Sequence, residues 1–487
     1  MYKKPTKQQL LIRRTIVSVV ASVLVLITVT VTVLFMLGYR LDSGTIEQGA
    51  LLQFDSSPNG ADVWVDGKLV NGRTATKQTV LSGTHTVRIA KNGYEEWTRT
   101  LDLAAGTLTW LDYIRLIPND RPAKEVFAYQ NLVSMTFSPE NRWAIAQELP
   151  DQPVFQLIDL RSEKVTAATL TIPQDVVSEA GADGVTHAYA VHSWNSGGRY
   201  VLIKHTYNET VEWLVLDTQD RNNDRNITRL LSIDLKDVAF LGTNGVSYYG
   251  LAADDTIRKL DIGARTISGA LITGVHSFSL FDSSIIQYIG ADGAEPGTKV
   301  AGVYRDGDSA PHVLRSGVPE DTPLAIAVTR YYSNDYVAIA EGGEVVVLMG
   351  SYPGSSDQDA SSLKERSTIA LQAPITALSF SPEGDFMVAQ SSDAYLSYEL
   401  EHLRIATGTV APNADGVTER LQWLDEAHLW SGVGQGLVMR DFNGINAHQI
   451  MHITPGFDAS LSQNGRFFYG VHKTDAGYIF QRVTMVL

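Results

Sequence analysis

The sequence predicts a mainly β protein with one apolar helix near its first residue. Three observations predict this. Residues 16–38 form an uncharged apolar run, residues 50–118 alternate apolar and polar residues between tight turns, and one strand–turn–strand pattern recurs through residues 119–487. Alternation with a period of two indicates strands. We therefore expect a basic tail (1–14), a transmembrane helix (15–38), a linker (39–49), a small β domain (50–118) and a repeat array (119–487).

The N-terminal helix is predicted from charge and length. Five Lys or Arg residues and no acidic residue stand among the first fourteen, and the apolar run of 23 residues follows. Such a helix is about 35 Å long, enough to cross a bilayer core of about 30 Å. The basic tail should stay in the cytoplasm. We expect a retained single-pass anchor in the plasma membrane, with the bulk of the chain extracytoplasmic. The alternative is a cleaved signal peptide, but its apolar core is normally shorter and no Ala-x-Ala site follows Gly38.

Composition limits the function. The chain has no cysteine, which excludes disulfides and thiolate catalysis. Without the five basic residues of the tail, 34 basic and 54 acidic residues remain, a net charge of −20. This charge argues against a nucleic-acid partner and against contact with an anionic lipid surface.

Residues 50–118 predict a small sandwich of five or six short strands. A strand at residues 51–54 leads into the turn Pro58-Asn59-Gly60, and residues 61–65 alternate after it. Asp66-Gly67 is a strong hairpin signal, because glycine readily supplies the positive φ of such turns. Residues 84–90 alternate again, and a turn at Asn92-Gly93 follows.

This stretch resembles the PEGA domain family. The residues that carry the resemblance are Pro58, Asn59, Gly60 and Ala61 at the name-giving motif, Asp66 and Gly67 at the hairpin, Gly83 before the next strand, and Gly93 with Tyr94. One departure is Arg73-Thr74-Ala75, where a Gly-Thr-Pro-like turn is usual. The resemblance implies a non-enzymatic β module of envelope proteins that serves as a spacer or wall-attachment element, and it brings no catalytic residues.

Aromatic residues of this module have two interpretations. Trp64, Trp97 and Trp110, with Tyr94, could form a stacking surface for cell-wall glycan. The alternative is that they pack the core and edges of a small domain that is short of apolar area. We favour packing.

From residue 121 onward, an apolar strand that ends in a large residue is followed by a short polar turn and a second apolar strand. Proline presets φ at the first corner of such a turn, and Gly or Asn accepts the left-handed corner. The four clearest copies are Phe137–Trp143, Trp194–Tyr200, Phe380–Phe386 and Leu461–Phe467, and the four looser ones are Phe240–Tyr248, Leu280–Tyr288, Val328–Tyr336 and Trp423–Trp430.

The copies are 40 to 57 residues apart, the period of four-stranded propeller blades. They resemble the blades of TolB-like and WD40-like β-propellers, a resemblance that carries no function. Eight blades are expected, with Lys124–Tyr129 completing the last one and closing the ring. A seven-bladed ring and a pair of sandwiches are the alternatives.

Two patterns suggest metal ligands, and both are incomplete. Asp220, Asn222 and Asp224 alternate like the start of a calcium loop, but Arg225 and Leu231 stand where that loop needs Gly and Glu. His448 and His452 would meet only on a helix, and their context is a strand. We therefore expect neither a metal nor a cofactor.

No catalytic motif is present: the chain has no Gly-x-Ser-x-Gly, no His-Glu-x-x-His and no phosphate-binding glycine loop. Longer polar insertions at 174–187, 217–226, 292–297 and 351–366 should lie on the rims of the ring, where propellers bind partners. We expect a non-enzymatic envelope protein whose propeller binds a protein or glycan. The alternatives are a propeller glycosidase or lyase acting on surface polysaccharide, and a sensor that signals through a partner helix.

Overall fold

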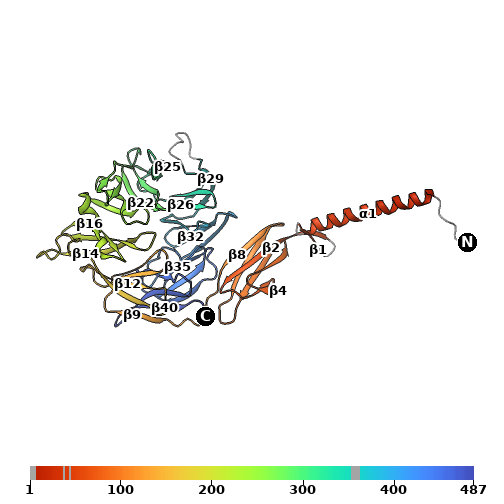
Figure 1. Ribbon diagram of the computed structural model, residues 1–487, viewed down its shortest axis with the longest axis horizontal. Coiled ribbons are helices and arrows are strands. Elements are labelled where there is room, and N and C mark those ends of the chain that lie inside the picture. The colour runs from red at the N-terminus through yellow and green to blue at the C-terminus, as the bar shows by residue number, and fades with distance from the viewer. Residues whose placement is uncertain (1–6, 37–38, 43–44, 353–361) are drawn as a thin grey trace. The chain divides into compact units, whose positions relative to one another are not determined.

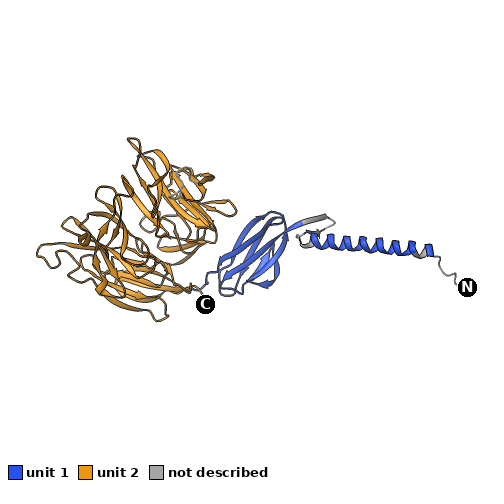
Figure 2. Ribbon diagram, turned by 45° about the horizontal axis from the view of Figure 1, so that its top comes forward, with its two compact units in different colours: residues 1–120 blue, residues 121–487 orange. Residues whose placement is uncertain are grey.

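The computed structural model describes residues 7–36, 39–42, 45–352 and 362–487 of the chain. Two compact units make it up, residues 1–120 and 121–487 (Figure 2). The first contains the N-terminal helix and a small β-sandwich, and the second contains eight four-stranded sheets among its described residues (Figure 1).

The N-terminal helix α1 (Lys7–Met36) carries Lys7, Arg13 and Arg14 in its first turns and is apolar on every side from Ile16 onward. Its segment Leu11–Leu34 is long and apolar enough to cross a membrane, and none of it is buried against the protein. The threonine hydroxyls within it donate to backbone carbonyls one turn earlier, at 2.8 Å from Thr28 to Leu24 and from Thr30 to Leu26. Such bonds satisfy these polar groups without water, so the threonines do not oppose an apolar environment.

Two strands begin within residues 39–49, where we expected a linker. Strand β1 (Tyr39–Asp42) pairs antiparallel with the start of β2 (Thr45–Ser57), so that Tyr39 lies opposite Gln48. The polar composition concealed this hairpin, but its aromatic, leucine and isoleucine residues favour strands. The helix also begins earlier than expected, inside the basic tail.

The small sandwich consists of two four-stranded sheets packed face to face. One sheet contains β1, β2, β5 (Thr76–Leu81) and β8 (Leu108–Arg115), and the other contains, in spatial order, β4 (Lys68–Arg73), β3 (Asp62–Val65), β6 (Gly83–Ala90) and β7 (Trp97–Leu103). Their inner faces meet in one apolar core that includes Phe54, Val63 and Ile89. The predicted alternation of residues 61–65 is confirmed, because Ala61, Val63 and Val65 are buried.

Seven of the eight four-stranded sheets described in the second unit are antiparallel meanders in chain order. The first four blades are β10 (Ser134–Phe137), β11 (Trp143–Gln147), β12 (Val154–Asp159), β13 (Thr166–Thr171); β14 (His187–Trp194), β15 (Tyr200–Tyr207), β16 (Thr210–Asp217), β17 (Arg225–Asn226); β18 (Leu235–Phe240), β19 (Ser247–Ala252), β20 (Ile257–Asp261), β21 (Thr266–Ile267); and β22 (Val275–Phe281), β23 (Ile285–Gly290), β24 (Thr298–Arg305), β25 (His312–Pro319).

The next three blades follow the same order: β26 (Leu324–Tyr331), β27 (Asn334–Glu341), β28 (Glu344–Gly350), β29 (Lys364–Ala370); β30 (Ala377–Phe380), β31 (Phe386–Gln390), β32 (Ala394–Glu399), β33 (Arg404–Thr409); and β34 (Gln422–Trp423), β35 (His428–Val433), β36 (Gly436–Asp441), β37 (His448–His452). Two short helical segments, η1 (Arg221–Asn223) and α2 (Ile227–Leu231), flank β17 in the second blade.

The eighth blade joins the two ends of the unit. Strands β38 (Ser460–Leu461), β39 (Phe467–Thr474) and β40 (Gly477–Thr484) come from the end of the chain, and β9 (Lys124–Tyr129) pairs antiparallel with β40. Apolar side chains of blades 8 and 1 share a core that includes Tyr469 and Met135. The predicted eight-bladed ring and its closing strand are therefore confirmed, and the seven-bladed and sandwich alternatives are excluded.

Hydrogen bonds explain the recurring turn. In the four clearest copies a Ser or Asn follows the first strand, and its side-chain oxygen accepts a bond from the backbone N–H five residues later. The distances are 3.0 Å for Ser138, Ser381 and Ser462 and 2.8 Å for Asn195. The backbone N–H of the Ser or Asn in turn donates to the carbonyl of the residue five positions later. The repeated residues are thus those that close the turn.

Candidate functional site

The name-giving turn of the small sandwich is held by a residue that sequence reasoning did not single out. Gly60 adopts φ +76° and donates its N–H to the Thr74 carbonyl at 2.7 Å. The Thr74 hydroxyl bonds the Ser56 hydroxyl at 2.7 Å and accepts from Ala61 N–H at 3.0 Å. Thr74 lies in the segment 73–75 that departs from the usual turn. Its hydrogen bonds nevertheless link this segment to Ser56, Gly60 and Ala61.

The hairpin residues also bind the neighbouring strand. Asp66 and Gly67 both have positive φ and link β3 to β4. The Asp66 carboxylate accepts from Thr86 N–H at 2.9 Å and contacts Nδ1 of His85 at 2.6 Å. These hydrogen bonds, His85 first, lower the pKa of Asp66. The motif residues therefore fix turns, as a structural role requires.

The remaining motif residues occupy turns and the core. The peptide bond before Pro58 is cis, and the Asn59 carbonyl accepts from Lys91. Gly83 begins β6 with φ +130°, and Gly93 adopts φ +86°. Tyr94 is buried in the sandwich core.

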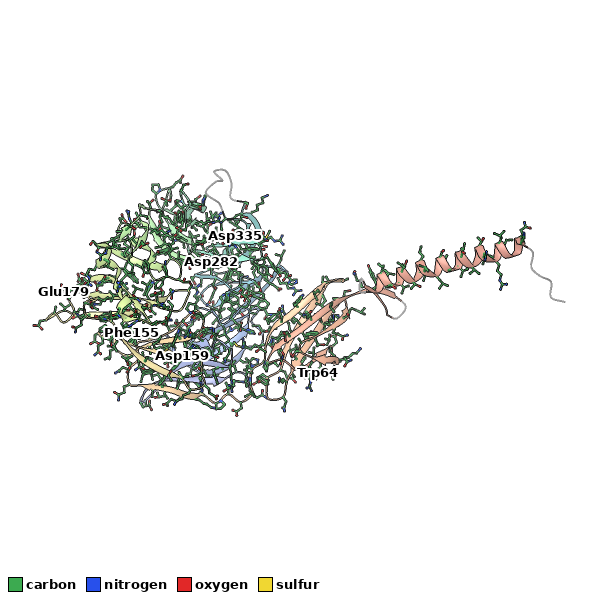
Figure 3. The ribbon with its side chains drawn as sticks, viewed as in Figure 1. Trp64, Phe155, Asp159, Glu179, Asp282 and Asp335 are labelled. Atoms are coloured by element: carbon green, nitrogen blue, oxygen red, sulfur yellow. The ribbon has the colours of Figure 1, made fainter. Side chains whose placement is uncertain are left out.

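The three tryptophans do not form one surface. Trp97 is 2% exposed in the core, so it presents no ring face to a ligand. Trp64 lies on the outer face of its sheet, where the Arg88 guanidinium stands 3.8 Å from its ring centroid (Figure 3). Trp110 is 51% exposed on the outer face of the other sheet, where its neighbour Leu111 faces the core. The two outer rings are thus on opposite sides of the sandwich.

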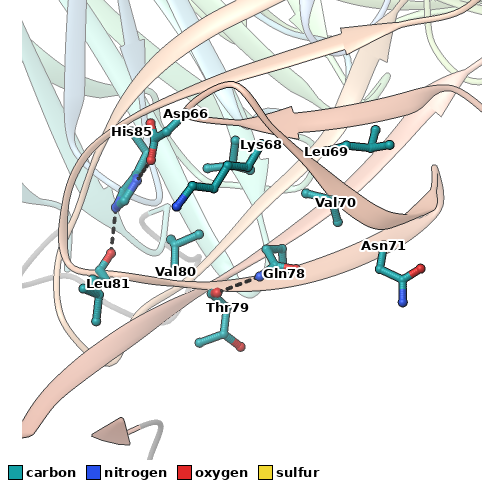
Figure 4. Close-up of a pocket in the computed structure, with 11 residues that line it drawn as sticks. Asp66, Lys68, Leu69, Val70, Asn71, Gln78, Thr79, Val80, Leu81 and His85 are labelled. Atoms are coloured by element: carbon teal, nitrogen blue, oxygen red, sulfur yellow. Dashed lines mark hydrogen bonds and ion pairs between the residues drawn. The ribbon is translucent and has the colours of Figure 1, made fainter. Parts of the chain in front are cut away.

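A cleft of about 640 Å³ opens where the edge strands β4 and β5 of the two sheets face each other (Figure 4). Val70 and Val80 form its apolar part, and Asp66 with His85 stands at one end. Side chains cover the free edge of β5: Nε2 of His85 bonds the Leu81 carbonyl at 2.8 Å and the Gln78 amide bonds the Thr79 carbonyl at 3.0 Å. Covering edge carbonyls in this way opposes pairing with another strand.

The central channel of the propeller is lined by the first strand of each blade, because first strands of neighbouring blades contact one another, as β26 does with β30. Among these eight strands as the structure describes them, Asp237 is the one acidic residue. Its carboxylate lies 3.1 Å from Nε2 of His192. Ser, Ala, Val and aromatic residues are the majority of the residues in these strands.

A channel pocket of about 560 Å³ lies along β22, β26 and β30. Its charged residue is Arg420, which donates to the Leu378 carbonyl at 3.2 Å. Ser279 accepts from the Gln287 amide nitrogen at 2.7 Å, and the buried Oε1 of Gln287 has no hydrogen-bond partner among the described atoms. The pocket offers hydroxyls and one cation rather than a pair of carboxylates.

Neither metal pattern from the sequence assembles a site. Asp224 is buried and accepts from Asp217 N–H at 2.8 Å, whereas Asn222 is exposed. Burial raises the pKa of Asp224 to about 6. His448 and His452 are at the two ends of β37. Within the described residues, no group of three His, Cys, Asp or Glu side chains is placed to hold a metal ion.

Blade 2 contains a buried polar chain that sequence reasoning missed. Nδ1 of His205 lies 2.7 Å from the Glu212 carboxylate, and its Nε2 lies 2.9 Å from Nδ1 of His187. Burial alone would raise the pKa of Glu212, but hydrogen bonds from His205, Asn226 and Ser178 outweigh it and lower the pKa to about 2. Glu212 is thus ionised, and Nδ1 of His205 must donate to it. The three residues stand on the consecutive strands β14, β15 and β16, and the register of those strands brings their side chains together.

The insertions do not all form rim loops, because residues 225–226 of the second are strand β17, and Asp224 and Asn226 are buried. The first is folded against blade 2, where Asn226 donates to the Val176 carbonyl at 3.1 Å. The second contains η1, and the third connects β23 to β24. Residues 353–361 of the fourth, expected at 351–366, lie outside the described residues.

Comparison with known proteins identifies one domain. Residues 50–116 match the PEGA domain family, and no curated protein matches the chain. Similar solved structures include the propeller domain of Cps50 (Swd1) from Myceliophteria thermophila (10% identity, TM-score 0.38, covering 74% of this chain and 99% of that one) and an oligogalacturonate lyase in complex with manganese (11%, 0.37, 74% and 98%). A third is dihydro-heme d1 dehydrogenase NirN (14%, 0.43, 67% and 68%).

These structural similarities are too distant to carry a functional argument. The chain therefore combines an apolar N-terminal helix, a PEGA domain at residues 50–116 and a C-terminal eight-bladed β-propeller.

Proposed function

We propose that the protein is a single-pass, non-enzymatic envelope protein. Its N-terminus would be cytoplasmic, its PEGA domain would act as a spacer or wall-attachment element, and its propeller would bind a protein or glycan partner. The proposal depends on three features of one chain. The N-terminal helix has a long uncharged apolar segment, the rest of the chain is acidic and free of cysteine, and the described first strands of the blades contain one carboxylate.

The helix supports the anchor. Its apolar side chains are largely exposed, an arrangement stable in lipid and unstable in water. Five basic residues precede its uncharged part, which favours an N-terminus in the cytoplasm. The acidic surface of the remainder suits a solvated location away from anionic lipid.

The channel supports binding over catalysis. A glycosidase needs two carboxylates about 5 to 9.5 Å apart across its substrate. The single carboxylate of the first strands, Asp237, is beside His192 instead. The pocket along β22, β26 and β30 presents hydroxyls and Arg420, groups suited to holding a ligand.

An affinity experiment tests the proposal. An ectodomain of residues 45–487 would be incubated with membrane-protein extract and, separately, with purified cell-wall glycan. We expect saturable binding to one of them and no release of reducing sugar or unsaturated product from the glycan. Recovery of neither ligand, or turnover of the glycan, would contradict the proposal.

A further inference from the structure

Two bulky residues at hairpin tips of blades 5 and 6 adopt a left-handed backbone conformation. Tyr332, in the two-residue turn between β26 and β27, has φ +50°. Leu403, the last residue of the turn between β32 and β33, has φ +55°. A residue with a Cβ atom is disfavoured there, and glycine or asparagine is the usual occupant. The presence of Tyr and Leu in this disfavoured conformation calls for a role of their side chains.

Burial does not supply that role. The Tyr332 side chain is 78% exposed and that of Leu403 is 40% exposed. Ile405, two residues beyond Leu403 on β33, is 53% exposed. We call Tyr332, Leu403, Ile405 and the exposed Glu401 the rim patch.

Contacts through Tyr331 connect the turn of Tyr332 in blade 5 to the turn of Glu401 in blade 6. The rings of Tyr331 and Tyr332 are 4.5 Å apart, and the Tyr331 hydroxyl donates to Oε2 of Glu401 at 3.2 Å. Ile405 stands opposite Tyr398, whose hydroxyl bonds Ser367 of blade 5 at 2.6 Å. Ile405 is therefore on the side of blade 6 that faces blade 5.

The surrounding charge is acidic. The turns at 330–335, 381–385, 399–404 and 424–427 all lie on this rim, because the first and third turns of a four-stranded meander share one end. They carry seven carboxylates and two arginines. Both arginines already contact carboxylates, Arg330 with Asp335 at 2.7 Å and Arg404 with Glu399 at 3.9 Å. A partner with positive charge is complementary to this rim.

We propose that the rim patch docks a protein segment in which arginine alternates with aliphatic residues. The guanidinium stacks on the Tyr332 ring and pairs with Glu401, while the aliphatic side chains cover Leu403 and Ile405. Tyrosine and arginine are enriched among the residues that carry most of the binding energy at interfaces. The inference rests on the proposed binding function and names the partner's chemistry.

The test uses the full-length chain in lipid nanodiscs and a fluorescent pentapeptide, Leu-Arg-Leu-Arg-Leu, followed by fluorescence anisotropy. We expect saturable binding that weakens at least tenfold in Tyr332→Gly and in Glu401→Gln. The counterpart Leu-Glu-Leu-Glu-Leu should not bind. In thermal melting, Tyr332→Gly should not lower Tm, because glycine relieves the backbone.

Arg265→Gly is the matched control. Arg265 is the last residue of the turn between the third and fourth strands of blade 3, the turn that corresponds to that of Leu403. It has φ +53° and is exposed, so Arg265→Gly relieves the same left-handed backbone conformation outside the rim patch. It should leave peptide affinity unchanged. If the peptide is attracted only by the overall negative charge of the protein, Tyr332→Gly will leave its affinity unchanged, as Arg265→Gly does. An unchanged affinity of Tyr332→Gly would overturn the inference.

Failure to bind the arginine peptide, or a clear fall in Tm for Tyr332→Gly, would also overturn it. The proposed binding function is tested separately by the affinity experiment. If the ectodomain captures a partner equally well with Glu401→Gln, the rim patch alone is contradicted. If the ectodomain captures no partner, the proposed binding function of the propeller is contradicted.

Discussion

At the residue scale, blade 2 derives stability from a buried hydrogen bond between the Glu212 carboxylate and His205. Glu212 and His205 are almost completely buried, and hydrogen bonds hold the pKa of Glu212 at about 2, below its usual 4.5. A carboxyl group whose folded-state pKa is depressed stabilises the fold above its unfolded pKa and loses that contribution as the pH falls toward the folded value.

We therefore predict that Glu212 contributes about 3 kcal/mol of stability at pH 7, which is lost between about pH 4.5 and pH 2. Urea unfolding of wild type and Glu212→Gln at several pH values measures it. The free energy of unfolding should decrease less steeply for Glu212→Gln in this range. Equal slopes for the two proteins would show that the pair does not carry this dependence.

Asp224 changes the stability with pH in the opposite direction from Glu212. Its burial raises the pKa to about 6, so the folded state holds the proton more tightly than the unfolded chain, and stability falls as the pH rises from about 3.8 to 6. Asp224→Asn keeps an oxygen for the Asp217 N–H and removes the charge. We expect it to raise the free energy of unfolding by about 1 to 2 kcal/mol at pH 8 and to have little effect at pH 3.

Asp224→Asn is compared with Asp220→Asn, because Asp220 belongs to the same turn and is exposed. Destabilisation by Asp224→Asn at pH 8 would mean that the ion pair with Arg221 outweighs the burial of the carboxylate.

Individual residues were the hardest part to predict from the sequence. Gly60, Asp66 and Gly67 were identified because turns demand particular backbone angles. Thr74 was not, because its hydroxyl acts on a turn more than ten residues earlier. The proximity of His187, His205 and Glu212 depends on strand register, which no local pattern encodes.

At the element scale, the repeats predicted the blades well because each copy contains its own turn chemistry. Ser138, Ser381 and Ser462 close equivalent turns with the same hydrogen bond. The hairpin at the start of the sandwich escaped prediction, since polar residues such as Glu47 and Gln48 outweighed its apolar ones. Short strands that rely on a partner leave a weak sequence signal.

The closing strand supplies an element-scale prediction. Successive residues of a strand direct their N–H groups to opposite sides, so Phe127→Pro combined with Ala128→Pro must remove a hydrogen bond from β9 to β40. We expect a loss of about 3 kcal/mol and exposure of the β40 edge. Ala123→Pro, just before β9, should be nearly neutral. Urea unfolding and light scattering measure both effects, and a stable, monomeric double variant would show that closure does not depend on β9.

At the scale of the whole molecule, the order of parts was predictable because each has a distinct signature: charge followed by an apolar run, turn-rich alternation, and a period of blade length. The proposed docking surface was not predictable. Exposure at Tyr332 and Leu403 and the crowding of carboxylates on one rim depend on the ring, in which turns that are distant in sequence become neighbours.

The account depends on a retained helix that places the propeller outside the cell. The most direct measurement is protease treatment of intact cells expressing the full chain with one tag at each end. We predict that both tags appear on one membrane-bound polypeptide, and that protease removes the C-terminal tag while the N-terminal tag stays protected. A mature protein without its N-terminal tag, or a C-terminal tag protected until the cells are lysed, would contradict the account.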